Sequence, residues 1–404
     1  MAIAKHNGPL DGIRILDLTS VVMGPYCTQA LADMGANVIK VESPEGDSAR
    51  VLPPCGPRGD GGTFRALNRG KRSIVLDLRQ PEGSKACLDL ARSCDVLVHS
   101  MRLAPLQKLG LSYAAVSAVN PSIVFCNLLG FGRNGRYAGL AAYDDIIQAV
   151  SGLVSLQEEL TGVPRYLPTI VGDKVSGLTA VSAITAALLH KARTGEGQEV
   201  DVPMFETIAA FVLVEHICGH AFDPPLDERP VYARIMAASR KPFATADGRI
   251  AMMAYNDKQW ANFARLIGRD ELITDERFCN LKARASNIQA WNETIADAIA
   301  TQTTAHWMKV LPEVGVPAIR INTTSELFTD PHLQDVGFFK SFDDPIDGGM
   351  RLPGFPVEFS KTPAGFTQAG PSLGEHTREV LEEAGFTSER IDKILIQQLQ
   401  TGPK

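Results

Sequence analysis

Short apolar runs alternate with amphipathic stretches through the first hundred residues, and this alternation restricts the fold more than any other feature of the sequence. The apolar run 13–18 is followed by a stretch that Gly24 and Pro25 open, and then by a second apolar run at 37–42. Such runs predict strands, and the stretches between them predict helices. A strand, a helix and a further strand in this order predict a right-handed crossover in a parallel sheet with helices on its faces.

The same alternation continues beyond residue 42. Three further strands and two helices are expected, the strands at 73–78, 95–98 and 122–128 and the helices at 81–93 and 104–110. From about 145 to 221 the pattern is largely helical, with breaks at 161–172 and 195–202. Together these elements predict a large α/β domain over residues 1–221.

A second, smaller α+β domain is expected after residue 221. Residues 222–241 are rich in Pro and Arg, which is typical of a linker. Within 242–325, Asp247 and Gly248 favour the tight turn of a hairpin, because this dipeptide readily adopts positive φ. Helices of this domain are expected at 257–267, 287–300 and 303–311. The remaining segment, 326–404, is rich in Pro and Gly and ends in two expected helices, 374–384 and 388–400.

Composition and charge argue against several classes of protein. A length of 404 residues favours two domains over one core, and a net charge of -6 argues against a nucleic-acid partner. No run reaches the ~18 apolar residues of a membrane span. The seven cysteines are scattered without a C-x-x-C pair, so neither a disulfide framework nor a metal site is expected. The N-terminal residues lack the features of a signal peptide, and a cytoplasmic location is expected.

Three glycines, Gly130, Gly132 and Gly135, match the G-x-G-x-x-G pattern of a dinucleotide site, and a strand-like run precedes them. Such a site also needs a helix directly after the glycines and an acidic residue about 20 residues further on. Residues 136–142 are typical of a loop instead. The sequence therefore gives weak support to NAD binding.

Asp173 stands between a turn-rich segment and the helical stretch 178–190. Two interpretations are open. Asp173 could cap the helix, its carboxylate accepting from the N–H groups of the first turn. It could equally be a nucleophilic carboxylate, since a helix N-terminus stabilises negative charge. The neighbouring Gly172 and Gly177 would let a bulky ligand approach the backbone closely.

Ordered blocks along nearly the whole chain resemble class III CoA-transferases, the family that includes formyl-CoA transferase, carnitine CoA-transferase and α-methylacyl-CoA racemase. The matching blocks lie at 16–19, 24–26, 31–42, 67–73, 130–132, 143–144, 148–152, 172–173 and 194–198, with weaker similarity at 247–248, 256–257 and 373–377. The resemblance implies a Rossmann-like large domain completed by residues 326–404, a smaller domain inserted into it, and an interlocked homodimer. It also implies a reaction without a bound cofactor, in which coenzyme A is carried between substrates.

The resemblance implies that Asp173 is the catalytic nucleophile. Its carboxylate attacks an acyl-CoA thioester, and CoA then passes to a carboxylic acid acceptor through covalent aspartyl intermediates. The family's CoA contacts match Val22, Met23, Asn68, Arg69, Gly70, Lys71, Arg72, Ser100, Met101, Arg102, Lys108, Ala141, Ala142, Tyr143 and Asp144. Among these, Lys71 and Arg72 suit the nucleotide phosphates, because ammonium and guanidinium groups both bind phosphate oxygens. A solvated charged face is the alternative interpretation of the two cations.

Some residues depart from the family's pattern. Residues 234–240 contain no glycine, where oxalate-type members have a glycine-rich loop, and this makes a formyl and oxalate substrate pair doubtful. Related racemases have a histidine at the position of Tyr143, and a tyrosine with a pKa near 10 is a poor base at neutral pH. A racemase and a catalytically silent CoA-binding protein remain alternatives. Arg50, Arg58 and Arg65 could pair with the free carboxylate of a dicarboxylic substrate.

Overall fold

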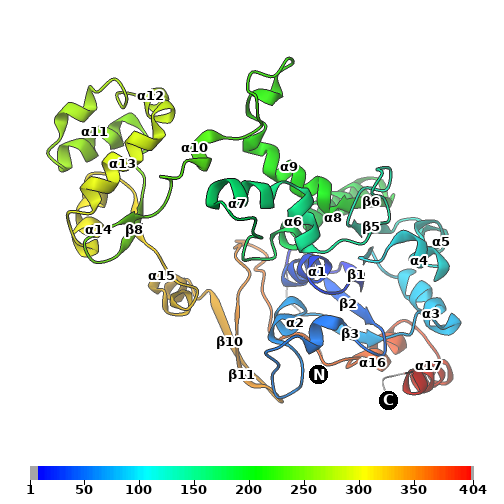
Figure 1. The fold of residues 1–404 in the computed structure, drawn as a ribbon. Helices are drawn as coiled ribbons and strands as arrows, with labels where there is room; N and C mark the ends of the chain where they lie inside the picture. The colour runs from blue at the N-terminus through cyan, green and yellow to red at the C-terminus, as the bar shows by residue number, and fades with distance from the viewer. Residues whose placement is uncertain (1–7, 402–404) are drawn as a thin grey trace. The chain divides into compact units, whose positions relative to one another are not determined.

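The computed structural model describes residues 8–401, with side chains described for 8–396. The chain divides into two compact units (Figure 1). The larger unit contains 8–153, 166–211 and 334–401, and the smaller unit contains 154–165 and 212–333. The segment 222–241, expected to be a linker, falls within the smaller unit. The domain boundaries drawn from the sequence stay predictions.

The larger unit is built on one sheet of six parallel strands. The strands are β1 (Arg14–Leu18), β2 (Asn37–Glu42), β3 (Arg72–Val75), β4 (Val96–His99), β5 (Val124–Leu129) and β6 (Gln198–Pro203). Their order is β3-β2-β1-β4-β5-β6, so the predicted parallel α/β sheet is confirmed. Strand β6 was expected only as a break between helices. It pairs with β5, where Val200 and Val202 lie opposite Cys126 and Leu128.

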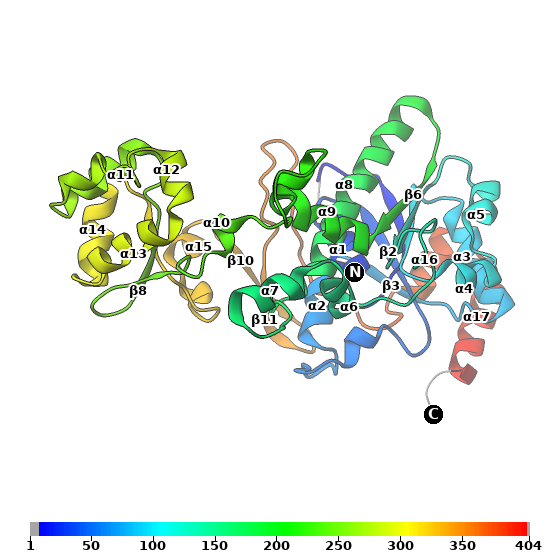
Figure 2. The ribbon, with the colours of Figure 1, turned by 45° about the horizontal axis from the view of Figure 1, so that its top comes forward.

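Helices cover both faces of this sheet (Figure 2). On one face α1 (Met23–Asp33) packs against α8 (Val171–Thr194), which also contacts β5 and β6. The opposite face packs its apolar side chains on α3 (Pro81–Ala91), α4 (Leu103–Lys108), α5 (Tyr113–Val119), α16 (Thr377–Glu383) and α17 (Ser388–Thr401). Apolar residues therefore line both faces of the central strands, as a covered parallel sheet requires.

The remaining helices of the first half are short or cross the border between the units. They are η1 (Ser48–Val51), α2 (Gly62–Leu67), α6 (Asp144–Val150), α7 (Leu153–Thr161), α9 (Met204–His216) and η2 (Cys218–Ala221). Among the described residues, α8 alone is long and apolar enough to cross a membrane by length and composition. Its buried positions include Gly177, where a Cβ atom would lie 2.7 Å from the carbonyl oxygen of Met23 in α1. In this unit α8 is a packed helix.

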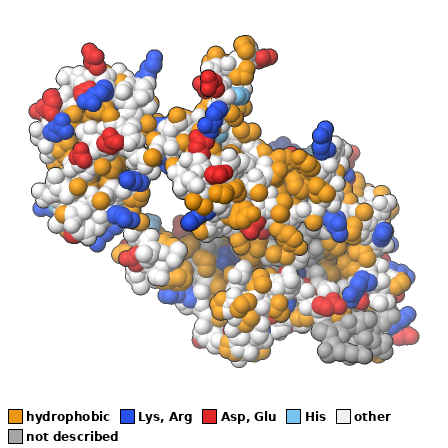
Figure 3. Space-filling model, viewed as in Figure 1, with side chains coloured by type: hydrophobic (Ala, Val, Ile, Leu, Met, Phe, Trp, Pro, Cys, Tyr) orange, Lys and Arg blue, Asp and Glu red, His pale blue; other side chains and the backbone are white. Residues whose placement is uncertain are grey.

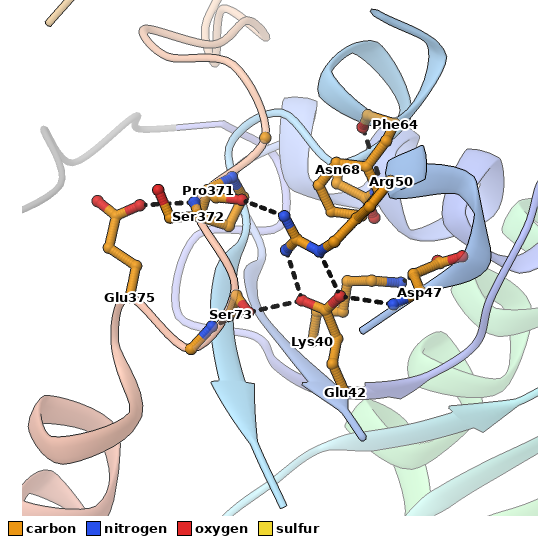
Figure 4. A network of polar contacts seen from close by, with 12 residues as sticks. Lys40, Glu42, Asp47, Arg50, Phe64, Asn68, Ser73, Pro371, Ser372 and Glu375 are labelled. Atoms are coloured by element: carbon orange, nitrogen blue, oxygen red, sulfur yellow. Dashed lines mark hydrogen bonds and ion pairs between the residues drawn. The ribbon is translucent and has the colours of Figure 1, made fainter. Parts of the chain in front are cut away.

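The C-terminal segment returns to the larger unit and binds the edge of its sheet. It begins with α15 (Pro331–Asp335) and the antiparallel pair β10 (Phe339–Asp344) and β11 (Gly348–Pro353). Further along, the N–H of His376 donates to the carbonyl oxygen of Ser73 in β3 (2.9 Å), and Arg50 donates to the carbonyl oxygen of Pro371 (3.1 Å; Figure 4). The C-terminal segment thus completes the fold that the first strands and helices begin.

The smaller unit has its own core around Trp260, Phe263 and Trp291. Its antiparallel sheet, in the order β7-β8-β9, contains β7 (Phe243–Ala244), β8 (Arg249–Met252) and β9 (Ala318–Arg320). The predicted hairpin is confirmed, because residues 245–248 join β7 to β8, but neither Asp247 nor Gly248 has the positive φ expected of the turn. The helices are α10 (Ala233–Met236), α11 (Asp257–Leu266), η3 (Asp270–Ile273), α12 (Leu281–Ser286), α13 (Ile288–Ile299), α14 (Thr304–Glu313) and η4 (Glu326–Thr329).

Candidate active site

A cavity of about 590 Å³ lies at the carboxyl ends of the parallel strands of the larger unit. Its walls come from residues 20–23 after β1, 100–105 after β4, 128–131 at the end of β5, and Met204 after β6. The chain winds outward from β1 to β3 and then returns to β4, on the other side of β1. Ligands of such sheets bind where the winding direction changes, outside the carboxyl ends of the strands. The cavity occupies this position.

Asp173 lines the cavity from the first turn of α8. The helix begins at Val171, so Asp173 is its third residue and the predicted N-cap role is wrong. Asp144, at the start of α6, takes over that role, because its Oδ1 accepts from the N–H of Asp173 at 3.1 Å. The side chain of Asp173 is therefore not needed to satisfy the helix end.

The environment of Asp173 disfavours its charged form. Burial, and secondly the negative charge of Asp144, raise the pKa of Asp173 to about 6. Asp144 is itself held in place, since its Oδ2 accepts from Gln148 Nε2 at 2.6 Å and Gln148 Oε1 accepts from the N–H of Leu167 at 2.9 Å. At neutral pH Asp173 is mostly ionised, but its charge is poorly solvated.

The two glycines beside Asp173 serve packing within the protein. A Cβ atom at Gly172 would lie 3.0 Å from Asp144 Oδ1, and one at Gly177 would meet the carbonyl oxygen of Met23. These glycines let α8 approach α6 and α1 closely. For Gly177 the close neighbour is protein backbone, where the sequence suggested a ligand.

The structure gathers about half of the predicted coenzyme A contacts around the cavity. These are Val22, Met23, Ser100, Met101, Arg102, Ala141, Ala142 and Tyr143, together with the predicted nucleophile Asp173. Arg102 is exposed and forms no ion pair within residues 8–396. It is therefore a cation that the larger unit leaves available to an anionic ligand.

Sequence reasoning missed several lining residues, among them Val21, Leu103, Phe131 and Arg133. Three of them lie one or two positions from predicted contacts or at the end of a strand, so the strand ends were a usable signal. Arg133 belongs to the glycine motif at 130–135. That motif forms a loop, not a helix start, and Arg133 pairs there with Glu199 at 2.8 Å and with Asp201.

The other predicted contacts do not line the cavity, and the best-buried of their cations already has partners in the protein. Lys71 is fully buried, and its Nζ contacts Asn68 Oδ1 at 2.8 Å, the carbonyl oxygen of Pro25 at 3.1 Å and Asp17 Oδ2 at 3.2 Å. Burial lowers the pKa of Lys71 to about 8, although Asp17 opposes this. Through its contact with Pro25, the ammonium group thus fixes the first turn of α1.

The neighbouring arginines are also engaged. Arg69 pairs with Asp33 at 2.6 Å and Arg72 with Glu383 at 2.9 Å. The remaining predicted contacts, Gly70, Lys108 and Asp144, do not line the cavity either. Neither Lys71 nor Arg72 has a free side chain for the nucleotide phosphates in this unit. Their phosphate contact stays a prediction that the observed ion pairs disfavour.

The three arginines suggested for a dicarboxylic substrate are likewise paired within the protein. Arg50 binds Glu42 at 2.7 Å and Asp60 at 3.0 Å. Arg58 binds Asp344 at 2.6 Å, and Arg65 binds Asp344 and, at 3.2 Å, Asp347. The pairs of Arg58 and Arg65 join these residues to the C-terminal segment. They correct the suggestion that the three side chains await a substrate.

A family model described as CoA-transferase family III matches residues 10–377. The chain belongs to this family. It is 36% identical over 390 residues to the succinate–glutarate CoA-transferase of Agrobacterium fabrum, which covers 94% of this chain and 96% of the relative. It is 33% identical over 387 residues to a succinyl-CoA:mesaconate CoA-transferase of Haloarcula hispanica, covering 94% of this chain and 97% of that one.

A solved structure supports the same assignment. The CAIB/BAIF family protein of Brucella suis matches this family III chain with a TM-score of 0.78 and 33% identity, over 94% of this chain and all of that one. The resemblance stated from the sequence blocks is confirmed, and the chain is an enzyme of CoA-transferase family III. Within the described residues, no three His, Cys, Asp or Glu side chains lie together in a way that could hold a metal ion.

Proposed function

We propose that this enzyme moves CoA from an acyl-CoA thioester to a carboxylic acid through covalent intermediates on Asp173. The observation that carries the proposal is a carboxylate with a raised pKa in the wall of the cavity at the strand ends. A buried carboxylate loses hydrating water, and bond formation removes the charge that burial and Asp144 disfavour. The cause that raises the pKa of Asp173 therefore also favours its attack on an acyl group.

The proposed steps balance without an oxidant or reductant. Asp173 attacks the thioester carbonyl, the carbon–sulfur bond breaks, and a mixed anhydride and CoA thiolate result. The thiolate attacks the aspartyl carbonyl and releases the donor acid, which leaves an aspartyl-CoA thioester. The acceptor carboxylate attacks this thioester, which forms a second mixed anhydride and releases CoA thiolate again. The thiolate then attacks the acceptor's acyl carbon, which gives the new acyl-CoA and frees the carboxylate of Asp173.

We propose small dicarboxylic acids as the acids exchanged. The relatives whose names mention succinate, glutarate and mesaconate support this substrate class. In the larger unit the cavity is lined by two cations, Arg102 and Arg133, and Arg133 is already paired with both Glu199 and Asp201. Arg102 is the better candidate for a phosphate or a free carboxylate, because its guanidinium can bind either with two parallel hydrogen bonds.

A homodimer in the cytoplasm is proposed as the working form. Apolar side chains stand exposed along α8 and α9, and Figure 3 shows hydrophobic atoms gathered over the region of these helices. The residues are Leu178 and Leu189 of α8, Phe211, Leu213 and Val214 of α9, and Ile217 directly after α9. Exposed apolar patches of this kind mark interaction sites in soluble proteins. The interlocked arrangement and the Rossmann-like nucleotide domain are parts of the same proposal.

The proposal is tested by a matrix of CoA thioesters against carboxylic acids, read by mass spectrometry of the CoA products. New acyl-CoA should form from dicarboxylic acceptors. The transfer activity should persist after the enzyme has been treated with a chelator and passed through gel filtration. The racemase alternative predicts a different product, since an α-proton of a single-epimer 2-methylacyl-CoA would exchange in deuterated water. Exchange without any CoA transfer would overturn the proposed function.

A further inference from the structure

The turn that joins β1 to α1 has an unusual backbone. Val21 has a φ of 69°, and it lines the cavity together with Ser20, Val22 and Met23. A β-branched side chain clashes with its own backbone in this left-handed region. Such residues keep the conformation only where surrounding contacts impose it, and they gather at functional sites.

A buried ion pair supplies those contacts. Oδ1 of Asp47 accepts from the N–H of Val21 at 3.1 Å, and Oδ2 accepts from Lys40 Nζ at 2.8 Å. The same ammonium donates to the carbonyl oxygen of Thr19 at 2.9 Å. Lys40 and Asp47 therefore bind the backbone on both sides of Ser20. Both side chains are buried, so the contacts are not weakened by water.

The backbone of Asp47 is held in place as well, through Glu42 (Figure 4). The N–H of Asp47 donates to Glu42 Oε2 at 3.1 Å, and Arg50 binds both oxygens of Glu42, at 2.7 and 2.8 Å. Ser73 Oγ donates to Glu42 Oε1 at 2.6 Å. The position of Asp47 is thus set by β2, β3 and η1 before any ligand arrives.

We propose that Lys40 and Asp47 are positioning residues for coenzyme A. Their pair holds Val21 in its left-handed conformation and so keeps residues 20–23 in the shape of the binding wall. The inference rests on the proposed function, because it takes CoA as the occupant of the cavity. When only a fraction of molecules has the competent wall, the apparent Kd rises by the inverse of that fraction.

The first test is the Asp47→Asn variant, titrated with free coenzyme A in a calorimeter. The amide keeps the shape of the carboxylate but turns an NH₂ donor toward either the ammonium of Lys40 or the N–H of Val21. One of the two contacts is lost whichever way the amide lies. The Kd for CoA should rise about tenfold, as expected if about a tenth of the molecules keep the wall.

A second variant, Lys40→Met with Asp47→Ala, removes both charges, so that no buried ammonium is left unpaired. It keeps the test decisive if the Asn variant does not fold, and the same rise in Kd is expected. A measurement specific to the positioning role compares the effect of Asp47→Asn on the Kd for CoA with and without the Val21→Gly substitution. Glycine adopts positive φ without strain, so Asp47→Asn should weaken CoA binding by about threefold or less when Gly replaces Val21.

Asp347→Ala is the matched control. Asp347 also accepts a backbone N–H, that of Arg58 at 2.9 Å, and pairs with Arg65, but neither arginine lines the cavity. This variant should melt at a lower temperature and bind CoA with unchanged Kd. Equal Kd values for wild type and both Asp47 variants, or equal losses with and without the Val21→Gly substitution, would refute the positioning role. Failure of the wild type to bind CoA would overturn the proposed function as well.

Discussion

At the scale of single residues, the carboxylate of Asp173 is the charge on which the proposed reaction depends, and burial and the negative charge of Asp144 disfavour it. The pKa of Asp173 is raised to about 6. The cations Lys71, Arg69 and Arg72, by contrast, form ion pairs with carboxylates that lie far away in the sequence. The position of Asp173 in the cavity wall agrees with the resemblance. The pairing of the cations could not be read from the sequence, because Glu383 is over 300 residues from Arg72.

The charge of Asp144 gives a first prediction. Asp144→Asn keeps an acceptor for the N–H of Asp173 but removes the negative charge beside it, so the pKa of Asp173 should fall. The acid limb of the activity profile should move to lower pH by about half a unit to one unit, since burial remains the larger cause. Asp145→Asn, an exposed neighbour on α6, is the control. An acid limb that stays in place would contradict the account.

The pKa of Asp173 also predicts a stability effect. A carboxyl group whose pKa is raised by folding stabilises the fold at low pH and loses this contribution as pH rises through about 6. Asp173→Asn should therefore be more stable than wild type at pH 8, by roughly 1–3 kcal/mol, and the difference should vanish near pH 4. Urea unfolding at both pH values measures it. A variant that is less stable at pH 8 would mean that the carboxylate supports the fold.

At the scale of elements, the sequence predicts those that depend on adjacent residues, but not those that depend on pairing between residues far apart in the chain. The Asp247-Gly248 turn and the strands β1, β2 and β5 follow from a few adjacent residues. Strand β6 was missed because the half-buried Glu199 and the exposed Asp201 interrupt its apolar run, and its pairing with β5 spans about 70 residues. The start of α8 was placed too late, since the residue that caps it, Asp144, comes from another helix.

The α1–α8 contact predicts the effect of Gly177→Ala. In an open helix this change stabilises by about 1 kcal/mol, because alanine is the better helix former. Here the new Cβ would lie 2.7 Å from a backbone oxygen of α1, and the protein should lose about 1–3 kcal/mol instead. Ser182→Ala, at an exposed position of the same helix, is the control. A stabilised Gly177→Ala variant would show that α1 and α8 are not tightly packed.

At the scale of the whole molecule, the C-terminal segment and the first hundred residues form one unit through the contacts of Arg50, Arg58 and His376. Composition and periodicity did not predict this closure; the family resemblance did. The proposed dimer would account for the exposed apolar residues of α8 and α9. A single chain's pattern predicts which residues are apolar, but not which of them another copy covers.

The proposed interlocked dimer predicts resistance to dilution. Chains that thread each other cannot separate without unfolding, so the dimer should persist at nanomolar concentration. Mass photometry over a dilution series measures this directly. Val214→Asp, on the exposed face of α9, should lower the yield of folded protein, whereas Lys258→Asp, at an exposed position of the smaller unit, should not. A stable, folded monomer at nanomolar concentration would refute the interlocked form.

The most direct measurement is the mass of the protein after mixing with an acyl-CoA that it accepts. The account predicts a covalent adduct on the peptide that contains Asp173, trapped by hydroxylamine or borohydride. It also predicts that Asp173→Asn stays folded, forms no adduct and loses at least about a thousandfold in transfer rate, since an amide cannot form the anhydride. An adduct on Asp144 or Asp145, or a folded Asn variant with near-normal transfer, would contradict the central claim.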